Sequence, residues 1–183
     1  MCPRHHRNPP SNVFDLRLWP KRPGAPKRSG TPDRPGAPDR SGSGEDDGVA
    51  RRDSQRAEPT TCPCGQGLPY ADCCRRLHTG SADAPTAEAL MRSRYAAFVV
   101  GDPEYLLRSW HTSTRPPRLR LDPGQRWTGL EIVDTDRGGL FDSTGTVEFR
   151  AHYREAGRPG TVAERSRFVR EDGRWVYLDA GST

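Results

Sequence analysis

The spacing of apolar residues divides the chain into three stretches. Residues 1–60 contain almost no apolar clusters, residues 61–78 contain four cysteines, and residues 85–180 contain most of the Trp, Tyr and Phe. A stretch with so little apolar surface cannot offset the entropy lost on ordering it. We therefore expect residues 1–60 to be a disordered tail and the two later stretches to fold.

Two helices are predicted at the start of the third stretch. Thr86 can cap the first helix, and Gly101 ends it. Asp102 followed by Pro103 is typical of a new helix start, and a pair of prolines further on prevents its continuation. The apolar face of the first helix is formed at helical spacing by Leu90, Met91, Tyr95, Phe98 and Val99.

Beyond about residue 119 the apolar period changes from helical to alternating, which indicates strands. Leu130 and Ile132 begin one strand, and a second is predicted around Phe149. Hairpin turns are predicted at 157–160 (Gly-Arg-Pro-Gly) and at 172–173 (Asp-Gly). Two helices followed by antiparallel strands indicate an α+β domain in which the helices cover one face of the sheet.

The tail differs from the rest of the chain in charge and in repetition. Residues 22–30 recur almost unchanged at 34–42, and this Pro/Gly/Ser/Arg repeat cannot nucleate a helix or a strand. Residues 1–60 carry 12 Lys and Arg against 8 Asp and Glu, whereas residues 61–183 carry 17 against 16. The nearly neutral folded part argues against a nucleic-acid-binding domain, so we expect at most weak nucleic-acid contacts through the tail. A second possibility is that translation starts downstream of part of this tail.

The compartment is predicted from the absence of an apolar membrane segment and of a signal peptide in the sequence. No stretch approaches the roughly 18 consecutive apolar residues of a membrane helix. The first 20 residues contain no apolar segment of the kind found in a signal peptide. We therefore expect a soluble cytoplasmic protein with no membrane partner.

Four of the five cysteines fall between positions 62 and 74. In a reducing compartment such clustering indicates metal binding before disulfides. Cys62, Cys64, Cys73 and Cys74 offer the four soft ligands that a tetrahedral zinc ion requires. Four thiolates would complete the coordination sphere, which predicts a structural Zn²⁺ ion. The alternatives are a pair of disulfides or unrelated buried thiols, but adjacent cysteines seldom form disulfides comfortably.

The fourth zinc ligand has one alternative. His78 lies four residues after Cys74 and would share its face if a short helix begins at Cys73 or Cys74. His78 could then replace Cys74.

Several strings resemble known families. Residues 62–74, Cys-Pro-Cys-Gly-Gln-Gly-Leu-Pro-Tyr-Ala-Asp-Cys-Cys, resemble the SEC-C motif, a zinc knuckle also found at the end of the SecA translocation ATPase. The strings at 87–98, 105–111, 164–168 and 172–179 resemble the YchJ-like family. The first resemblance implies a zinc knuckle at 61–78 with the four cysteines as ligands. The second implies a nuclear-transport-factor-2-like (NTF2-like) fold over 85–180, in which helices and a curved sheet form a cone that often holds a pocket.

Two residues are candidates for chemistry in such a cone. Glu164 shares the inward strand face of Val162 and Phe168, and His111 follows the second helix near the expected mouth. A His and a Glu around an apolar cavity can transfer protons to and from a small molecule. The simpler interpretation is that Glu164 pairs with an arginine or caps a backbone group, while His111 is an ordinary helix-end residue. We favour the simpler interpretation, and with it a non-catalytic protein that binds a protein partner or a small ligand; a small-molecule enzyme is the alternative.

Overall fold

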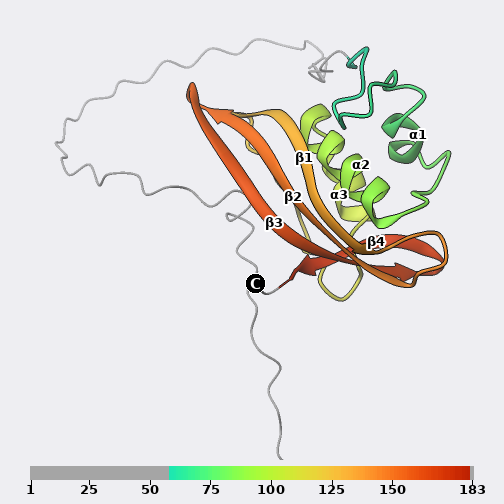
Figure 1. Ribbon diagram of the computed structural model, residues 1–183. Helices are drawn as coiled ribbons and strands as arrows, with labels where there is room; N and C mark the ends of the chain where they lie inside the picture. Colours follow the sequence, from blue (N-terminus) through green and yellow to red (C-terminus); the bar gives the residue numbers. More distant parts are fainter. Residues whose placement is uncertain (1–57, 182–183) are drawn as a thin grey trace, which may run out of the picture.

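The computed structural model describes residues 58–181, so the tail prediction concerns residues that lie almost entirely outside this range. Three helices come first along the chain: α1 (Cys74–His78), α2 (Ala87–Val100) and α3 (Pro103–Arg108). Four strands follow: β1 (Gln125–Arg137), β2 (Thr144–Glu155), β3 (Arg158–Glu171) and β4 (Arg174–Ala180). The long strands curve around α2 and α3, and α1 lies on the outer side of α2 (Figure 1).

The helix boundaries follow from the local signals. The Thr86 hydroxyl accepts a hydrogen bond from the backbone N–H of Ala89, and Gly101 ends α2 in the left-handed conformation at φ 81°. The Asp102 carboxylate caps α3 by accepting from the N–H of Tyr105, and Pro103 occupies the first turn. Both predicted helices are therefore confirmed, with the predicted ends of α2 and the predicted start of α3. The second helix ends earlier than predicted, at Arg108, well before Pro116 and Pro117.

The four strands form one antiparallel sheet in the order β1-β2-β3-β4. On β2 the buried and more exposed positions alternate as predicted, with Val147, Phe149 and Ala151 facing the core. A sheet of consecutive hairpins needs no crossover, so neighbours in sequence are neighbours in space.

One predicted turn is displaced. The β2–β3 turn lies at Ala156 and Gly157, both with positive φ, and Pro159 and Gly160 belong to β3. Two consecutive positive-φ residues give the tight turn whose twist matches the strands. Gly160 is required for another reason: the Tyr153 ring lies across it, and a Cβ there would lie 2.4 Å from the ring's Cζ.

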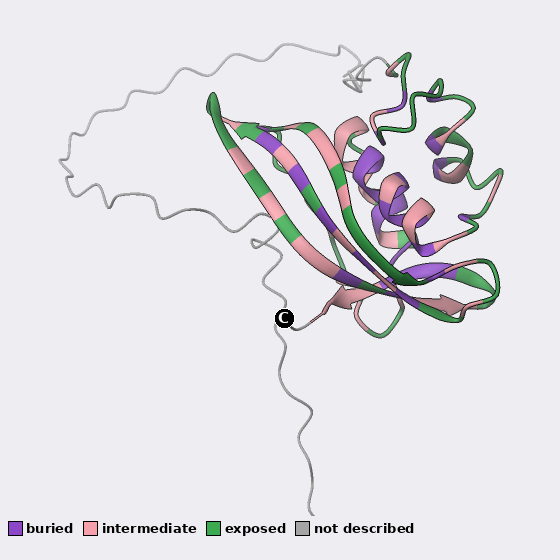
Figure 2. Cartoon of the chain, viewed as in Figure 1, coloured by how far each residue is buried: buried purple, intermediate pink, exposed green. Residues whose placement is uncertain are grey.

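The main core lies between α2 and the concave face of the sheet, and Figure 2 shows the buried residues gathered on these facing surfaces. It includes Leu90 and Tyr95 from α2, Phe149 and Phe168 from the sheet, and Trp175 from β4. A separate small cluster joins three of the cysteines and Tyr70 to Ala96 on the outer side of α2. The chain is thus the predicted α+β fold, with α2 between the sheet and the cysteine module.

Candidate functional site

The cysteine module begins as a tight loop closed by its own backbone. The N–H of Cys62 donates to the carbonyl of Leu68 at 2.8 Å, and the N–H of Tyr70 donates to the carbonyl of Thr60 at 3.1 Å. Gly65 and Gly67 turn the chain between these bonds at φ 85° and 74°, a region that side chains disfavour. The loop brings Cys62 and Cys64 back toward the start of α1.

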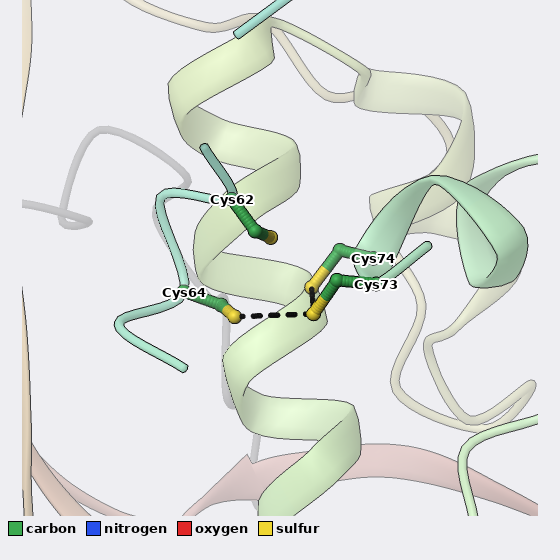
Figure 3. A group of neighbouring side chains, drawn as sticks. All are labelled: Cys62, Cys64, Cys73 and Cys74. Atoms are coloured by element: carbon green, nitrogen blue, oxygen red, sulfur yellow. Dashed lines mark hydrogen bonds between the residues drawn. The ribbon is translucent and has the colours of Figure 1, made fainter. Parts of the chain in front are cut away.

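The four cysteine sulfurs converge on one point (Figure 3). All four Sγ atoms lie within 4.8 Å of one another, and the cysteines are free thiols. The Sγ atoms of Cys64 and Cys73 are 3.5 Å apart, and those of Cys73 and Cys74 are 3.9 Å apart. Four sulfurs around a tetrahedral zinc ion, with Zn–S bonds of about 2.3 Å, would be separated by about 3.8 Å. The spacing therefore suits a metal ion bound by four thiolates.

The pKa values of Cys64, Cys73 and Cys74 are shifted in different directions. The pKa of Cys64 is lowered to about 5, chiefly because the Cys74 thiol donates a hydrogen bond to it, with a further bond from the backbone of Gln66. Burial raises the pKa of Cys73 to about 12, and the bond to Cys64 raises that of Cys74. The surroundings thus favour a thiolate at Cys64 and a protonated thiol at Cys73 and Cys74, and binding of a metal ion would displace those protons.

His78, the alternative fourth ligand, has both ring nitrogens occupied elsewhere. Nε2 lies 2.9 Å from the carbonyl oxygen of Ser93, which can only accept, so Nε2 carries the proton. Nδ1 then accepts a hydrogen bond from the Tyr70 hydroxyl at 2.8 Å. Burial also lowers the pKa of His78, which favours this neutral form. His78 therefore ties the module to α2 and does not join the four thiols.

Further contacts fix the module against the helices. The Arg92 side chain donates to the Cys64 carbonyl at 2.9 Å and forms an ion pair with Glu88 at 2.7 Å. Arg108 donates to the carbonyl of His78. Ala96 is fully buried beneath the cysteines, where a larger side chain would hold the module away from α2. The thiols are therefore positioned by tertiary contacts as well as by their own loop.

Comparison with known families now gives this arrangement a context. Residues 86–180 match the family described as "YchJ, middle NTF2-like domain". The chain belongs to the YchJ family. A UPF0225 protein from Streptomyces coelicolor is 64% identical over 118 residues, covering 64% of this chain and 92% of the relative. A UPF0225 protein from Deinococcus radiodurans is 51% identical over 120 residues, covering 65% of this chain and 87% of the relative.

Two solved structures extend the likeness to the cysteine module. A SEC-C motif containing protein from Rhodopseudomonas palustris shares 32% identity at a TM-score of 0.58, covering 67% of this chain and 98% of its own. A SEC-C motif containing protein from Psychrobacter arcticus shares 29% identity at a TM-score of 0.56, covering 69% and 85%. The resemblance to a YchJ-like protein with a SEC-C motif is thus confirmed, as is the NTF2-like fold.

The structure does not bring His111 and Glu164 together. His111 Nε2 lies 3.6 Å from a carboxylate oxygen of Glu171, and its Nδ1 accepts from the N–H of Ser113 at 3.1 Å. Glu164 instead accepts hydrogen bonds from the hydroxyls of Ser166 at 2.6 Å and Tyr177 at 3.1 Å. The simpler interpretation expected an arginine partner or a backbone cap for Glu164. Among residues 58–181 the structure shows neither, and two hydroxyl groups hold this carboxylate instead.

A cavity of about 590 Å³ lies at one end of the cone, and neither His111 nor Glu164 lines it. Its walls come from α2, the start of α3, residues 119–123 and the start of β1. The sequence analysis missed its two buried polar residues, Arg94 and Gln125. Arg94 could have been noticed, because it lies on the apolar face between Leu90 and Phe98 at helical spacing. Gln125 gives no comparable signal, since it precedes the alternating pattern.

Proposed function

We propose that this chain is a zinc protein in which a structural Zn²⁺ ion holds the cysteine module on α2, and that it binds a small ligand in the cone without catalysing a reaction. The observation that supports the zinc site is the convergence of four Sγ atoms within 4.8 Å. Sulfur ligands in tetrahedral array suit zinc better than the hard cations. Four thiolates leave no open position for a substrate, so the metal would supply stability and no chemistry.

Binding in the cone is supported by the cavity and by the separation of the catalytic candidates. Its volume of about 590 Å³ falls within the range of about 300–1,000 Å³ that is usual for small-molecule sites. His111 and Glu164 have separate partners and do not line this cavity, so this predicted proton-transfer pair does not face it. The proposal also places the protein in a reducing compartment such as the cytoplasm, where free thiols persist. None of the helices that the structure describes is long and apolar enough to cross a membrane.

Metal analysis of matched variants tests the zinc site. After expression in zinc-replete medium, we expect about one zinc per chain in the wild type and in His78→Ala, and almost none in Cys74→Ala. His78→Ala should melt at a lower temperature, because the hydrogen bonds to Tyr70 and Ser93 are lost. A wild type without zinc would end the proposal. Loss of zinc in His78→Ala with retention in Cys74→Ala would assign the fourth ligand to His78.

A further inference from the structure

The cavity at the end of the cone has largely apolar walls that include three aromatic side chains. Phe98 on α2, Trp110 after α3 and Trp127 on β1 line it, together with Leu119 and Leu121. Trp127 is held by edge contacts with Tyr95 and Tyr153, with ring centres 6.0 and 5.6 Å away. Flat, rigid walls of this kind favour a flat apolar ligand body.

A buried cation lies in the same cavity. The Arg94 side chain is 3% exposed, and its Nη1 donates to the Leu106 carbonyl at 2.8 Å and to the Ser109 hydroxyl at 2.6 Å. Its guanidinium also lies over the rings of Trp110 and Tyr177, at 5.2 and 4.6 Å from their centres. Burial lowers the pKa of Arg94 to about 10, so the group stays protonated at neutral pH.

The charge of Arg94 is only partly compensated by the protein. Among residues 58–181 no carboxylate forms an ion pair with Arg94, and the attraction of Glu164 acts without a direct hydrogen bond between them. Arg120 and Asp122 also line the cavity, but both are exposed and their charges oppose each other. The buried charge facing the cavity is therefore positive.

An unpaired amide lies in the same cavity. Gln125, the first residue of β1, is 8% exposed, and its Nε2 is buried without a hydrogen-bond partner in the part of the chain that the structure describes. Leaving such a donor unpaired destabilises the folded protein, so a position like this favours a ligand that supplies an acceptor. A guanidinium and an amide N–H in one cavity are both satisfied by an anionic oxygen.

We infer that the cavity binds a small organic carboxylate with a flat apolar body, whose carboxylate contacts Arg94 and Gln125 while its ring lies against Trp110, Trp127 and Phe98. The inference rests on the proposed ligand-binding function and names the ligand class. A carboxylate carries one charge, which matches the single buried cation. A phosphate ester carries nearly two and would need further donors.

The first test compares matched probes on the full-length, zinc-loaded protein. The probes share one naphthyl body and are 2-naphthoate, the neutral 2-naphthamide and 2-naphthyl phosphate. The readout is the NMR indole signals of Trp110 and Trp127. We expect 2-naphthoate to shift both signals and to bind about tenfold or more tightly than either of the others. Tighter binding of the phosphate overturns the choice of carboxylate. Equal binding of the amide overturns anion recognition but leaves ligand binding intact, and no shift with any probe overturns both.

Two variants assign the anion contact. Gln125→Leu removes the unpaired amide, so its melting temperature should equal or exceed that of the wild type while its affinity for 2-naphthoate falls about fivefold or more. Gln66→Leu, at an exposed position in the cysteine module, is the control and should bind like the wild type. Arg94→Lys keeps the charge but loses the planar donor pair, and should weaken 2-naphthoate more than 2-naphthamide. Unchanged 2-naphthoate affinity in Gln125→Leu would overturn the assignment, whether or not the Arg94 variant folds.

Discussion

Tyr177 lies between the buried Arg94 and the partly buried Glu164 of the cone. Its ring faces the guanidinium of Arg94 at 4.6 Å, and its hydroxyl donates to Glu164 at 3.1 Å. Glu164 thus receives charge compensation through an intervening ring and two hydroxyl groups. Burial outweighs these interactions and raises the pKa of Glu164.

This balance predicts how stability changes with pH. Because the pKa of Glu164 is higher in the folded than in the unfolded chain, its favourable contribution is complete below the ordinary value of 4.5 and is lost as pH rises through the raised value. Glu164→Gln does not titrate, so its melting temperature relative to the wild type should rise between pH 5 and pH 8.

The matched control for this measurement is Glu131→Gln, an exposed partner of Arg150 at 3.4 Å, because an exposed ion pair contributes little to stability. Thermal unfolding of the wild type, Glu164→Gln and Glu131→Gln across the pH range tests this prediction. A constant difference between Glu164→Gln and the wild type would show that hydroxyl bonds and the Arg94 charge cancel the effect of burial.

At the scale of elements, α2 packs against both the sheet and the cysteine module. Its inner side packs on the sheet, and its outer side carries the cysteine module through Ala96, Arg92 and the Ser93 carbonyl. The start of the helix is equally confined, since the backbone N–H of Ala87 donates to the Gly138 carbonyl at 2.9 Å. The position of α2 thus links the cysteine module to the cone.

The cap of α2 should therefore contribute to stability. Thr86→Ala removes the hydroxyl that accepts from the N–H of Ala89 at 3.1 Å, and we expect a loss of about 1 kcal/mol in the free energy of unfolding. Thr86→Ser keeps the acceptor and should retain most of it. Denaturant titration of both variants measures the difference, and equal losses in both would refute the role of the hydroxyl.

At the scale of the whole molecule, the main core and the outer cysteine cluster both include residues of α2. The main core contains no cysteine, whereas the outer cluster consists largely of cysteines with Tyr70 and Ala96. Such a small module has little apolar surface of its own, so metal binding would supply most of its folding energy. The cone holds most of the buried aromatic residues, so we expect its own core to stabilise it without a metal ion.

Removal of the metal should accordingly unfold the cysteine module and leave the cone folded. With a strong chelator at neutral pH, we expect the NMR amide signals of residues 60–78 to collapse toward unfolded positions. The signals of β2 and β3 should stay dispersed, and restoring zinc should reverse the change. Simultaneous loss of the sheet signals would show that the cone needs the metal as well.

Much of the fold was predictable because its signals are local. Thr86, Gly101 and Asp102 act on the backbone within four residues, and the strand alternation around Phe149 reflects a period that every strand shares. The cysteine spacing indicates a metal because a short loop keeps Cys62 and Cys64 near each other. The sequence by itself thus determined the α+β class, both predicted helices and the four candidate ligands.

Only the tertiary structure decided which polar groups meet. The partners of three polar residues lie 8 to 60 positions away in the sequence, where no local pattern indicates them. These contacts are the hydrogen bonds of His78 with Tyr70 and Ser93, the ion pair of His111 with Glu171, and the hydrogen bond of Glu164 with Tyr177. The cavity with Arg94 and Gln125 likewise arises where α2, the loop at 119–123 and β1 converge. Long-range packing determines these partners, because a buried polar group needs a hydrogen bond and can form it only with groups that the fold places nearby.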